Sequence, residues 1–129
     1  MSVLRGSLLV CMVIGAGGCS KAPITVHGQP VPYWVDALGK PDPRLRKQAV
    51  EALGNAGAAD PAVVPALMRA VKDPDAGIRA AAVLALLKIG PDAEEAIPVL
   101  TAAQKDSNAR VRRYAVEALA RIRGDSPNQ

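Results

Sequence analysis

The sequence predicts an all-α fold in which a unit of two short helices occurs three times. A period of 33 residues, apolar residues at helical spacing within each period, and the composition of the chain support this prediction. The chain of 129 residues contains 24 Ala, one Trp, two Tyr and no Phe. Aromatic side chains normally supply the largest blocks of buried surface, so this core must consist of Ala, Val, Leu and Ile in close contact. Closely packed helices meet that condition better than a β-sandwich or a β-barrel.

The period is visible when the chain is aligned with itself at an offset of 33 residues. A unit that cannot bury its apolar face alone is stabilised by stacking on its neighbours, and about three units are the minimum for such an array. The recurring columns are Pro32, Pro65 and Pro98; Leu45, Ile78 and Val111; Arg46, Arg79 and Arg112; Ala49, Ala82 and Ala115; Val50, Val83 and Val116; Ala52, Ala85 and Ala118; and Leu53, Leu86 and Leu119.

The beginning of the chain predicts a signal peptide at residues 1–18, ahead of the fold. Arg5 is the only charged residue before Lys21, and residues 7–18 form a run of 12 apolar or small residues. This run is shorter than the roughly 20 residues that cross a bilayer, but it fits the apolar segment of a secretory signal.

The signal ends in Ala16-Gly17-Gly18-Cys19, which resembles the lipobox of bacterial lipoproteins, although Leu is usual in that motif where Ala16 stands. The resemblance implies cleavage before Cys19 and attachment of diacylglycerol to its sulfur. It also implies a location in the bacterial cell envelope, exported and lipid-anchored to a membrane. A plain signal peptide cleaved nearby, or an uncleaved apolar helix, is the alternative interpretation.

Residues 19–31 predict the lipidated cysteine and a flexible tether, because this stretch contains two Pro, a Gly and several polar residues. His27 lies in it, and we expect a solvated side chain without a role. The repeat domain is expected at residues 32–124, and residues 125–129 are expected to form a disordered tail. The three units are expected at about 32–57, 58–90 and 91–124.

Each unit is interpreted as two helices joined by a polar turn. In the second helix, apolar residues at i, i+4, i+5, i+8 and i+11 form one stripe. Gly57 and Gly90 are expected to cap two of these helices at their carboxyl ends, and Asp60 and Asp92 to begin two of the first helices. The predicted second helices are 45–56, 78–89 and 111–122, and the predicted first helices are about 33–39, 61–72 and 93–105.

The order Asp-Pro-x-x-x-x-Arg, Ala-Val-x-Ala-Leu and Gly, as in residues 73–90, resembles the HEAT repeat family. The similarity is greatest to the short bacterial HEAT-like repeats of phycobilin lyases, and it covers roughly residues 28–124. It implies a right-handed α-solenoid of three helix pairs whose second helices line a concave face. The motifs of ankyrin and tetratricopeptide repeats, which have similar periods, are absent.

One arginine recurs near the start of each second helix, four residues after a polar turn residue. We expect each guanidinium to pair with the turn acids and so to stabilise the stack, while a ligand-binding ladder is the alternative. The column comprises Arg46, Arg79 and Arg112, which follow Asp42, Asp75 and Asn108.

Positions on the exposed side of the second helices differ between the units. Leu84 stands where the other units have Glu, and together with Ala80, Ala81 and Tyr114 it predicts a small apolar patch flanked by charge. Interaction surfaces often have this composition, although single exposed leucines are also common. The candidate partner-binding residues are Lys47, Glu51, Ala81, Leu84, Lys88, Arg113, Tyr114, Glu117 and Arg121.

The formal net charge is +4, and Arg110, Arg113 and Arg121 share the outward face of the last unit. We interpret them as a solvated end face, with anionic lipid headgroups or an acidic partner as the alternatives. Nucleic acid is not expected as a partner, because the repeats lack the aromatic platforms that stack on bases.

The repeats lack the residue sets of two kinds of catalytic site. The single His precedes them, so a Ser-His-Asp set is not available, and the His-Glu pairs of di-iron hydroxylases with HEAT-like helices do not occur. Two Cys and one His leave little material for a disulfide framework or a His/Cys metal site, and acidic residues at helix starts are explained by the helix dipole. We therefore expect no enzyme activity, cofactor, metal or small-molecule substrate.

The expected function is a membrane-anchored, non-catalytic interaction module or scaffold that binds a protein or peptide on its concave face. A passive structural component of the envelope, or the remnant of a longer repeat array, is the alternative.

Overall fold

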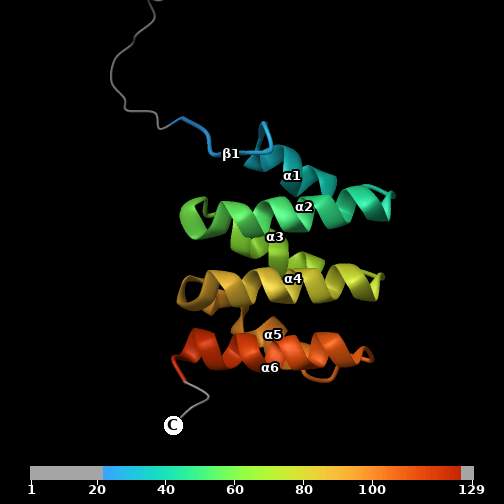
Figure 1. The fold of residues 1–129 in the computed structure, drawn as a ribbon, viewed down its shortest axis with the longest axis vertical. Helices are drawn as coiled ribbons and strands as arrows, with labels where there is room; N and C mark the ends of the chain where they lie inside the picture. The colour runs from blue at the N-terminus through green and yellow to red at the C-terminus, as the bar shows by residue number, and fades with distance from the viewer. Residues whose placement is uncertain (1–21, 126–129) are drawn as a thin grey trace, which may run out of the picture.

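A computed structural model describes residues 22–125 as a stack of helix pairs preceded by a β-hairpin (Figure 1). The predicted signal peptide, Cys19 and most of the predicted tail lie outside the described residues. The elements are β1 (Thr25–Val26), β2 (Gln29–Pro30), α1 (Val31–Ala37), α2 (Pro43–Ala56), η2 (Gly57–Ala59), α3 (Val63–Ala70), α4 (Ala76–Ile89), η3 (Gly90–Ala96), α5 (Ile97–Ala103) and α6 (Ala109–Arg123).

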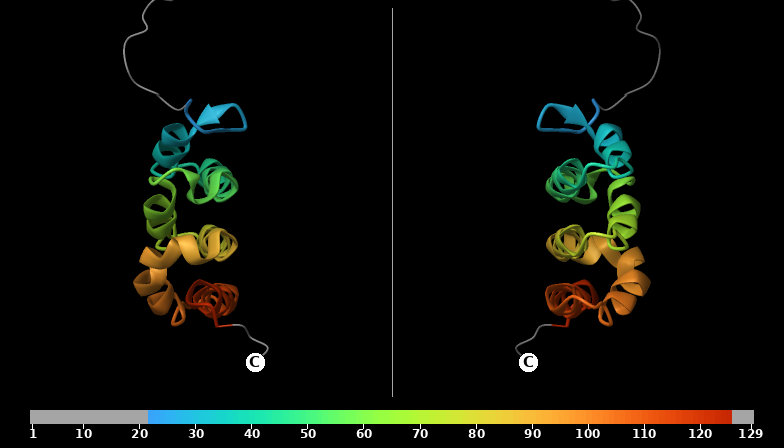
Figure 2. Two further views of the ribbon diagram at one scale, coloured as in Figure 1. Left: turned by 90° about the vertical axis from the view of Figure 1, so that its left-hand side faces the viewer. Right: turned by 90° about the vertical axis from the view of Figure 1, so that its right-hand side faces the viewer.

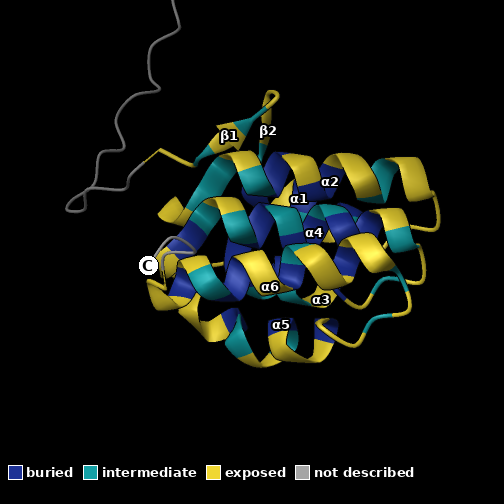
Figure 3. Cartoon of the chain, turned by 60° about the horizontal axis from the view of Figure 1, so that its bottom comes forward, coloured by how far each residue is buried: buried dark blue, intermediate teal, exposed yellow. Residues whose placement is uncertain are grey.

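The helices form two parallel columns, one of α1, α3 and α5 and the other of α2, α4 and α6 (Figure 2). Helix α2 packs beside α4, and α4 packs beside α6. The core lies between the columns and between successive units, where the buried sides of the helices face one another (Figure 3). The chain is therefore an all-α solenoid, and the two recurring Ala columns of the second helices supply small buried contact positions. These alanines are Ala49, Ala82 and Ala115, and Ala52, Ala85 and Ala118, of which Ala85 is 5% exposed and the others 0%.

The second helices are present in all three units, and each begins two residues earlier than the apolar stripe predicted. Their amino-terminal caps explain this difference. The side chains of Asp42, Asp75 and Asn108 accept hydrogen bonds from backbone N–H groups of the first helical turn, which satisfies donors that have no partner inside the helix. At the carboxyl ends, Gly57 and Gly90 have φ values of 66° and 73°, a region that glycine enters without steric cost.

The first helices differ more from the prediction. Asp60 accepts a hydrogen bond from the N–H of Ala62 at 2.8 Å, but α3 begins only at Val63. Asp92 does not cap α5, because it lies within η3, and Ala93 has non-helical backbone angles there. The proline column marks the true starts: Pro98 lies in the first turn of α5, where the missing N–H of proline costs nothing.

The expectation of a flexible tether up to residue 31 is wrong for its last part, which forms the β-hairpin. His27 and Gly28 make its two-residue turn with φ values of 52° and 77°, the positive values that match the twist of paired strands. The indole N–H of Trp34 donates to the carbonyl of Val26 at 3.0 Å. Trp34 is 7% exposed, so the hairpin and α1 together close the amino-terminal end of the stack.

Candidate protein-interaction face

The recurring arginines connect each unit to the following one. The Nε and a terminal nitrogen of Arg46 donate to the carboxylate of Asp73 at 2.8 and 3.3 Å. Arg79 makes the same paired contacts with Asp106 at 2.8 and 3.0 Å. Such bidentate pairs are among the strongest charged hydrogen bonds, and these carboxylates lie 27 residues further along the chain. We call this series of contacts the arginine ladder.

The ladder uses different acids from those that the sequence suggested. Asp42 and Asp75, which precede the arginines by four residues, cap their own helices and bind backbone N–H groups. The carboxylate of Asp73 instead accepts hydrogen bonds from Arg46 and, at 2.8 Å, from the backbone N–H of Asp75. Arg46 and Arg79 therefore pair with turn acids as predicted, but with those of the following unit and not with the acids four residues before them. Among residues 22–125 Arg112 has no such pair, so the prediction is wrong for the third unit.

The other terminal nitrogen of each guanidinium, Nη1, binds the turn that precedes its own helix. It donates to two successive backbone carbonyls, at distances between 2.7 and 3.1 Å in the three units. The hydrogen bond from Arg79 holds the pKa of Asp106 below its usual value, and the same bond raises the pKa of Arg79. Both groups are therefore charged at neutral pH. Arg46 and Arg79 each connect two turns that are far apart in sequence, whereas Arg112, within the described part of the chain, binds only its own turn.

The candidate partner-binding residues lie on one continuous face formed by α2, α4 and α6, which we call the second-helix face. Leu84, Ala81 and Tyr114 are half-buried, whereas Ala80 is buried at 4% exposure and does not belong to the patch as expected. Ala80 is buried because α4 lies between α2 and α6 in the stack and is covered by both. The remaining candidates, Lys47, Glu51, Lys88, Arg113, Glu117 and Arg121, are exposed.

A groove of about 320 Å³ runs between α2 and α4 on this face. Its lining includes half-buried Leu84 and Ala81 and the exposed, charged residues Glu51 and Lys88. A second depression of about 310 Å³ lies next to it, between the hairpin, α1 and α2, and Glu51 lines both. The second depression includes His27 and Trp34, so His27, which the sequence assigned to the tether, extends the face.

The part of the face on α6 is arranged around Tyr114. The guanidinium of Arg113 lies 5.2 Å from the centre of the Tyr114 ring, a cation–π contact. Arg113 also lies 3.7 Å from a carboxylate oxygen of Glu117, an exposed pair that contributes little to stability. Arg121 covers Gly90, since a Cβ at that glycine would lie 3.0 Å from its Nε. These side chains give the face charges of both signs beside a half-buried aromatic ring.

Comparison with known proteins identifies the repeats. A family model described as HEAT repeats matches residues 31–126. The chain belongs to the HEAT repeat family. Among solved structures, the crystal structure of an engineered protein matches 74% of this chain with a TM-score of 0.58 at 21% sequence identity. The match spans 46% of that protein's chain, and no curated protein sequence matches.

The family gives the second-helix face a general context, since HEAT repeats are commonly scaffolds for protein interaction. The engineered structure supports the fold alone. The closer similarity to repeats of phycobilin lyases and the lipoprotein signal remain predictions.

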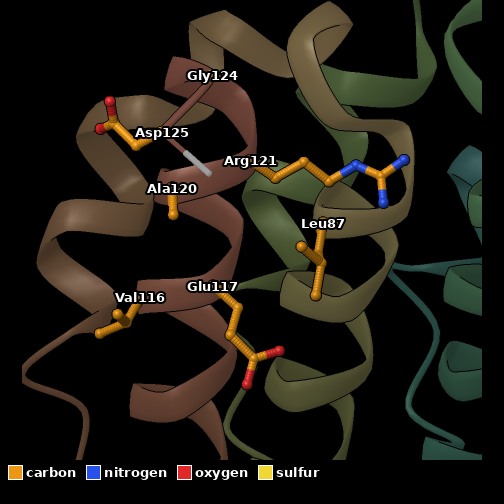
Figure 4. Close-up of a pocket in the computed structure, with 7 residues that line it drawn as sticks. All are labelled: Leu87, Val116, Glu117, Ala120, Arg121, Gly124 and Asp125. Atoms are coloured by element: carbon orange, nitrogen blue, oxygen red, sulfur yellow. The ribbon is translucent and has the colours of Figure 1, made fainter. Parts of the chain in front are cut away.

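A further depression of about 600 Å³ lies around α6 and was not expected from the sequence. Val116 lies on the side of α6 that is turned away from α4, while Glu117 and Arg121 point toward Leu87 of α4 (Figure 4). Val116 is 54% exposed, although Val50 and Val83 in the same HEAT column are fully buried. The position of Val116 in its column does not predict its exposure, because exposure depends on what packs against the helix.

Between residues 22 and 125, no three His, Cys, Asp or Glu side chains gather as a site for a metal ion. Of the two acidic residues in the turn before α4, Asp73 binds Arg46 and Asp75 caps the helix. A search of the same residues finds no helix that is long and apolar enough to cross a membrane.

Proposed function

We propose that the chain is a non-catalytic interaction module that binds a protein or peptide on the second-helix face. The observation that carries the proposal is the groove between α2 and α4, which is lined by half-buried Leu84 together with the charged residues Glu51 and Lys88. An apolar residue of a partner would gain buried surface on Leu84. The two charged sides would select the orientation of the partner through its own charges.

Tyr114 and Arg113 extend this surface by one unit. Partly buried aromatic residues and arginines are enriched where interfaces gain most of their energy, because they contribute large contact area with few rotatable bonds. A partner that lies across α2, α4 and α6 would contact both Leu84 and Tyr114. A passive envelope component, the competing hypothesis, would need neither side chain for its function.

The experiment is crosslinking and affinity capture with the full chain solubilised in detergent, comparing the native protein with two variants. We expect Leu84→Glu and Tyr114→Ala each to reduce capture of a specific partner at least about tenfold, equivalent to about 1.4 kcal/mol of binding energy. Ala102→Glu is the matched control, since Ala102 is exposed on α5 in the other column. Equal capture by all four proteins would contradict binding on this face.

We further propose that the module is held at a membrane of the bacterial cell envelope by lipid on Cys19. The support is the run of 12 apolar or small residues, 7–18, that immediately precedes this cysteine. Two or more acyl chains hold a protein on a bilayer far more firmly than one chain.

Intact mass of the protein from bacterial membranes tests the anchor. We expect an amino terminus at Cys19 with the added mass of the lipid, and release of the Cys19→Ala variant from the membrane fraction. An unmodified amino terminus, or cleavage at another residue, would contradict lipidation without affecting the proposal for the second-helix face.

A further inference from the structure

The side of α6 that is turned away from α4 has the same residue pattern as the helix sides that receive a following unit. At 100° per residue, Arg112 and Ala120 lie about 40° on either side of Val116. On α2 the equivalent positions are Arg46, Val50 and Gly54, and helix α4 packs against that side. We call the strip formed by Arg112, Val116 and Ala120 the terminal face.

Arg112 is held in the position that its equivalents occupy when they bind a carboxylate. One of its nitrogens donates to the carbonyls of Asp106 and Ser107 at 2.7 and 3.0 Å, as the matching nitrogens of Arg46 and Arg79 do in their own turns. The other nitrogens of Arg46 and Arg79 donate hydrogen bonds to an aspartate of the following unit. Within residues 22–125, no carboxylate accepts a hydrogen bond from Arg112.

The apolar residues of the terminal face are also accessible to a partner. Val116 is 54% exposed, and Ala120 is half-buried in the depression of about 600 Å³. A partner that covers Val116 as its equivalents are covered would remove its exposed apolar surface from water, which favours binding.

The charges decide what kind of partner fits. Arg112, Arg113 and Arg123 all lie within about 60° of Val116 around the helix axis, so two copies of this face would repel each other. The other end of the stack cannot supply the missing carboxylate, since Lys40 occupies the column in which Asp73 and Asp106 stand. A second copy of this chain is therefore disfavoured in both arrangements.

We propose that the terminal face is a docking site for an α-helix of another protein that carries a carboxylate in the turn before its first residue. The carboxylate would bind Arg112 as Asp73 binds Arg46, and small apolar residues of the partner helix would cover Val116 and Ala120. The two surfaces adjoin, since Glu117 and Arg121 of the second-helix face line the same depression as Val116 and Ala120. Arg112 is not among the residues of the second-helix face, so its substitution tests the terminal face alone.

The test uses a synthetic peptide with the sequence of residues 73–90, which contain the aspartate and the helix that pack on α2. The peptide carries Ala85→Gly, because Ala120 stands in the column of Gly54, where an added Cβ would lie only 3.0 Å from the Cβ of Ala85. It is titrated into the isotope-labelled full chain in detergent, and backbone amide shifts are followed by NMR. A second peptide with the additional change Asp73→Asn partitions into detergent equally and is the control.

We expect shifts centred on Arg112, Val116 and Ala120, with binding at least about fivefold weaker for the Asp73→Asn peptide. Arg112→Gln in the protein should weaken binding equally, whereas Arg110→Gln, on another side of α6, should not change it. Equal binding of both peptides, shifts confined to the second-helix face, or the absence of shifts would overturn the proposal. An Arg112-dependent dimer in sedimentation without peptide would also overturn it, because the occupant would then be a second copy.

Discussion

The two ends of the described solenoid are finished in different ways. At the amino-terminal end, the hairpin and α1 cover α2, and Trp34 joins them through its hydrogen bond to Val26. At the other end, α6 presents Val116 and Arg112 with the geometry of an inner unit but without the neighbour that inner units have. In a solenoid each unit contacts only its neighbours, so identical residues in one column contribute differently according to their position in the stack.

This contrast separates what a HEAT unit does for the fold from what it offers to a partner. In inner units the arginine binds an aspartate of the following unit and the valine is buried in the core, so neither is available to a partner. On α6 the same two residue types remain accessible. Substitutions in matched columns can therefore measure the contribution of the neighbouring unit directly.

The largest effect is expected at the covered end. Trp34→Ala should lower the free energy of unfolding by about 3–5 kcal/mol, because it removes a large buried side chain and leaves the hairpin without its hydrogen bond. Chemical denaturation followed by circular dichroism measures this change. Tyr33→Ala is the control, since Tyr33 is 44% exposed, and it should cost less than half as much. Similar losses for both would mean that the hairpin does not close the stack.

The valine column provides the second comparison. Val83→Ala should destabilise the protein by about 2 kcal/mol, because it leaves a cavity between α4 and α6. Val116→Ala should change the free energy of unfolding by less than about 0.5 kcal/mol, as exposed substitutions usually do. The same denaturation experiment checks both variants, and equal losses would show that Val116 is covered in solution.

The arginine column gives a smaller difference. Arg79→Gln removes two bonds to Asp106 and two to backbone carbonyls, and we expect a loss of roughly 1–2 kcal/mol. Arg112→Gln removes only the two carbonyl bonds described above and should cost less than half of that. Thermal unfolding of both variants measures the difference. If Arg112→Gln were as harmful as Arg79→Gln, Arg112 would already have a second partner.

Local sequence signals predicted much of the fold. The second helices and their glycine caps follow from a stripe and from residues that act within their own turn. The starts of α3 and α5 were placed too early, because Asp60 and Asp92 resemble caps, whereas Pro98 marks the first turn more reliably.

The candidate site was less accessible to sequence reasoning, because its decisive contacts are not local. Asp73 and Asp75 both lie near an arginine in sequence, and only the stacking of units shows that Arg46 reaches the first of them. The burial of Ala80 likewise depends on neighbouring helices. The sequence does not predict the hairpin, because Gly and Pro are also typical of flexible segments, whereas Gly28 here supplies one of the two positive φ values of an ordered turn.

The smallest expected effect is the pH dependence of the ladder. Since the Arg79 hydrogen bond holds the pKa of Asp106 below its usual value of 3.8, the folded protein keeps this carboxylate charged at lower pH than the unfolded chain does. The pair therefore contributes its full stability above about pH 4 and loses it as the pH falls through the lowered pKa.

Asp106→Asn should consequently be less stable than the native protein at pH 7, and the difference should shrink below the usual pKa of the carboxyl group. Thermal unfolding between pH 7 and pH 2 measures this trend in the native protein, in Asp106→Asn, in Arg79→Gln and in the double variant. In the Arg79→Gln background the pH-dependent part of the Asp106 effect should largely disappear, because its cause has been removed. A difference that persists unchanged at low pH would mean that Asp106 acts through the shape of its turn, which its bond from the N–H of Asn108 also supports, and not through its charge.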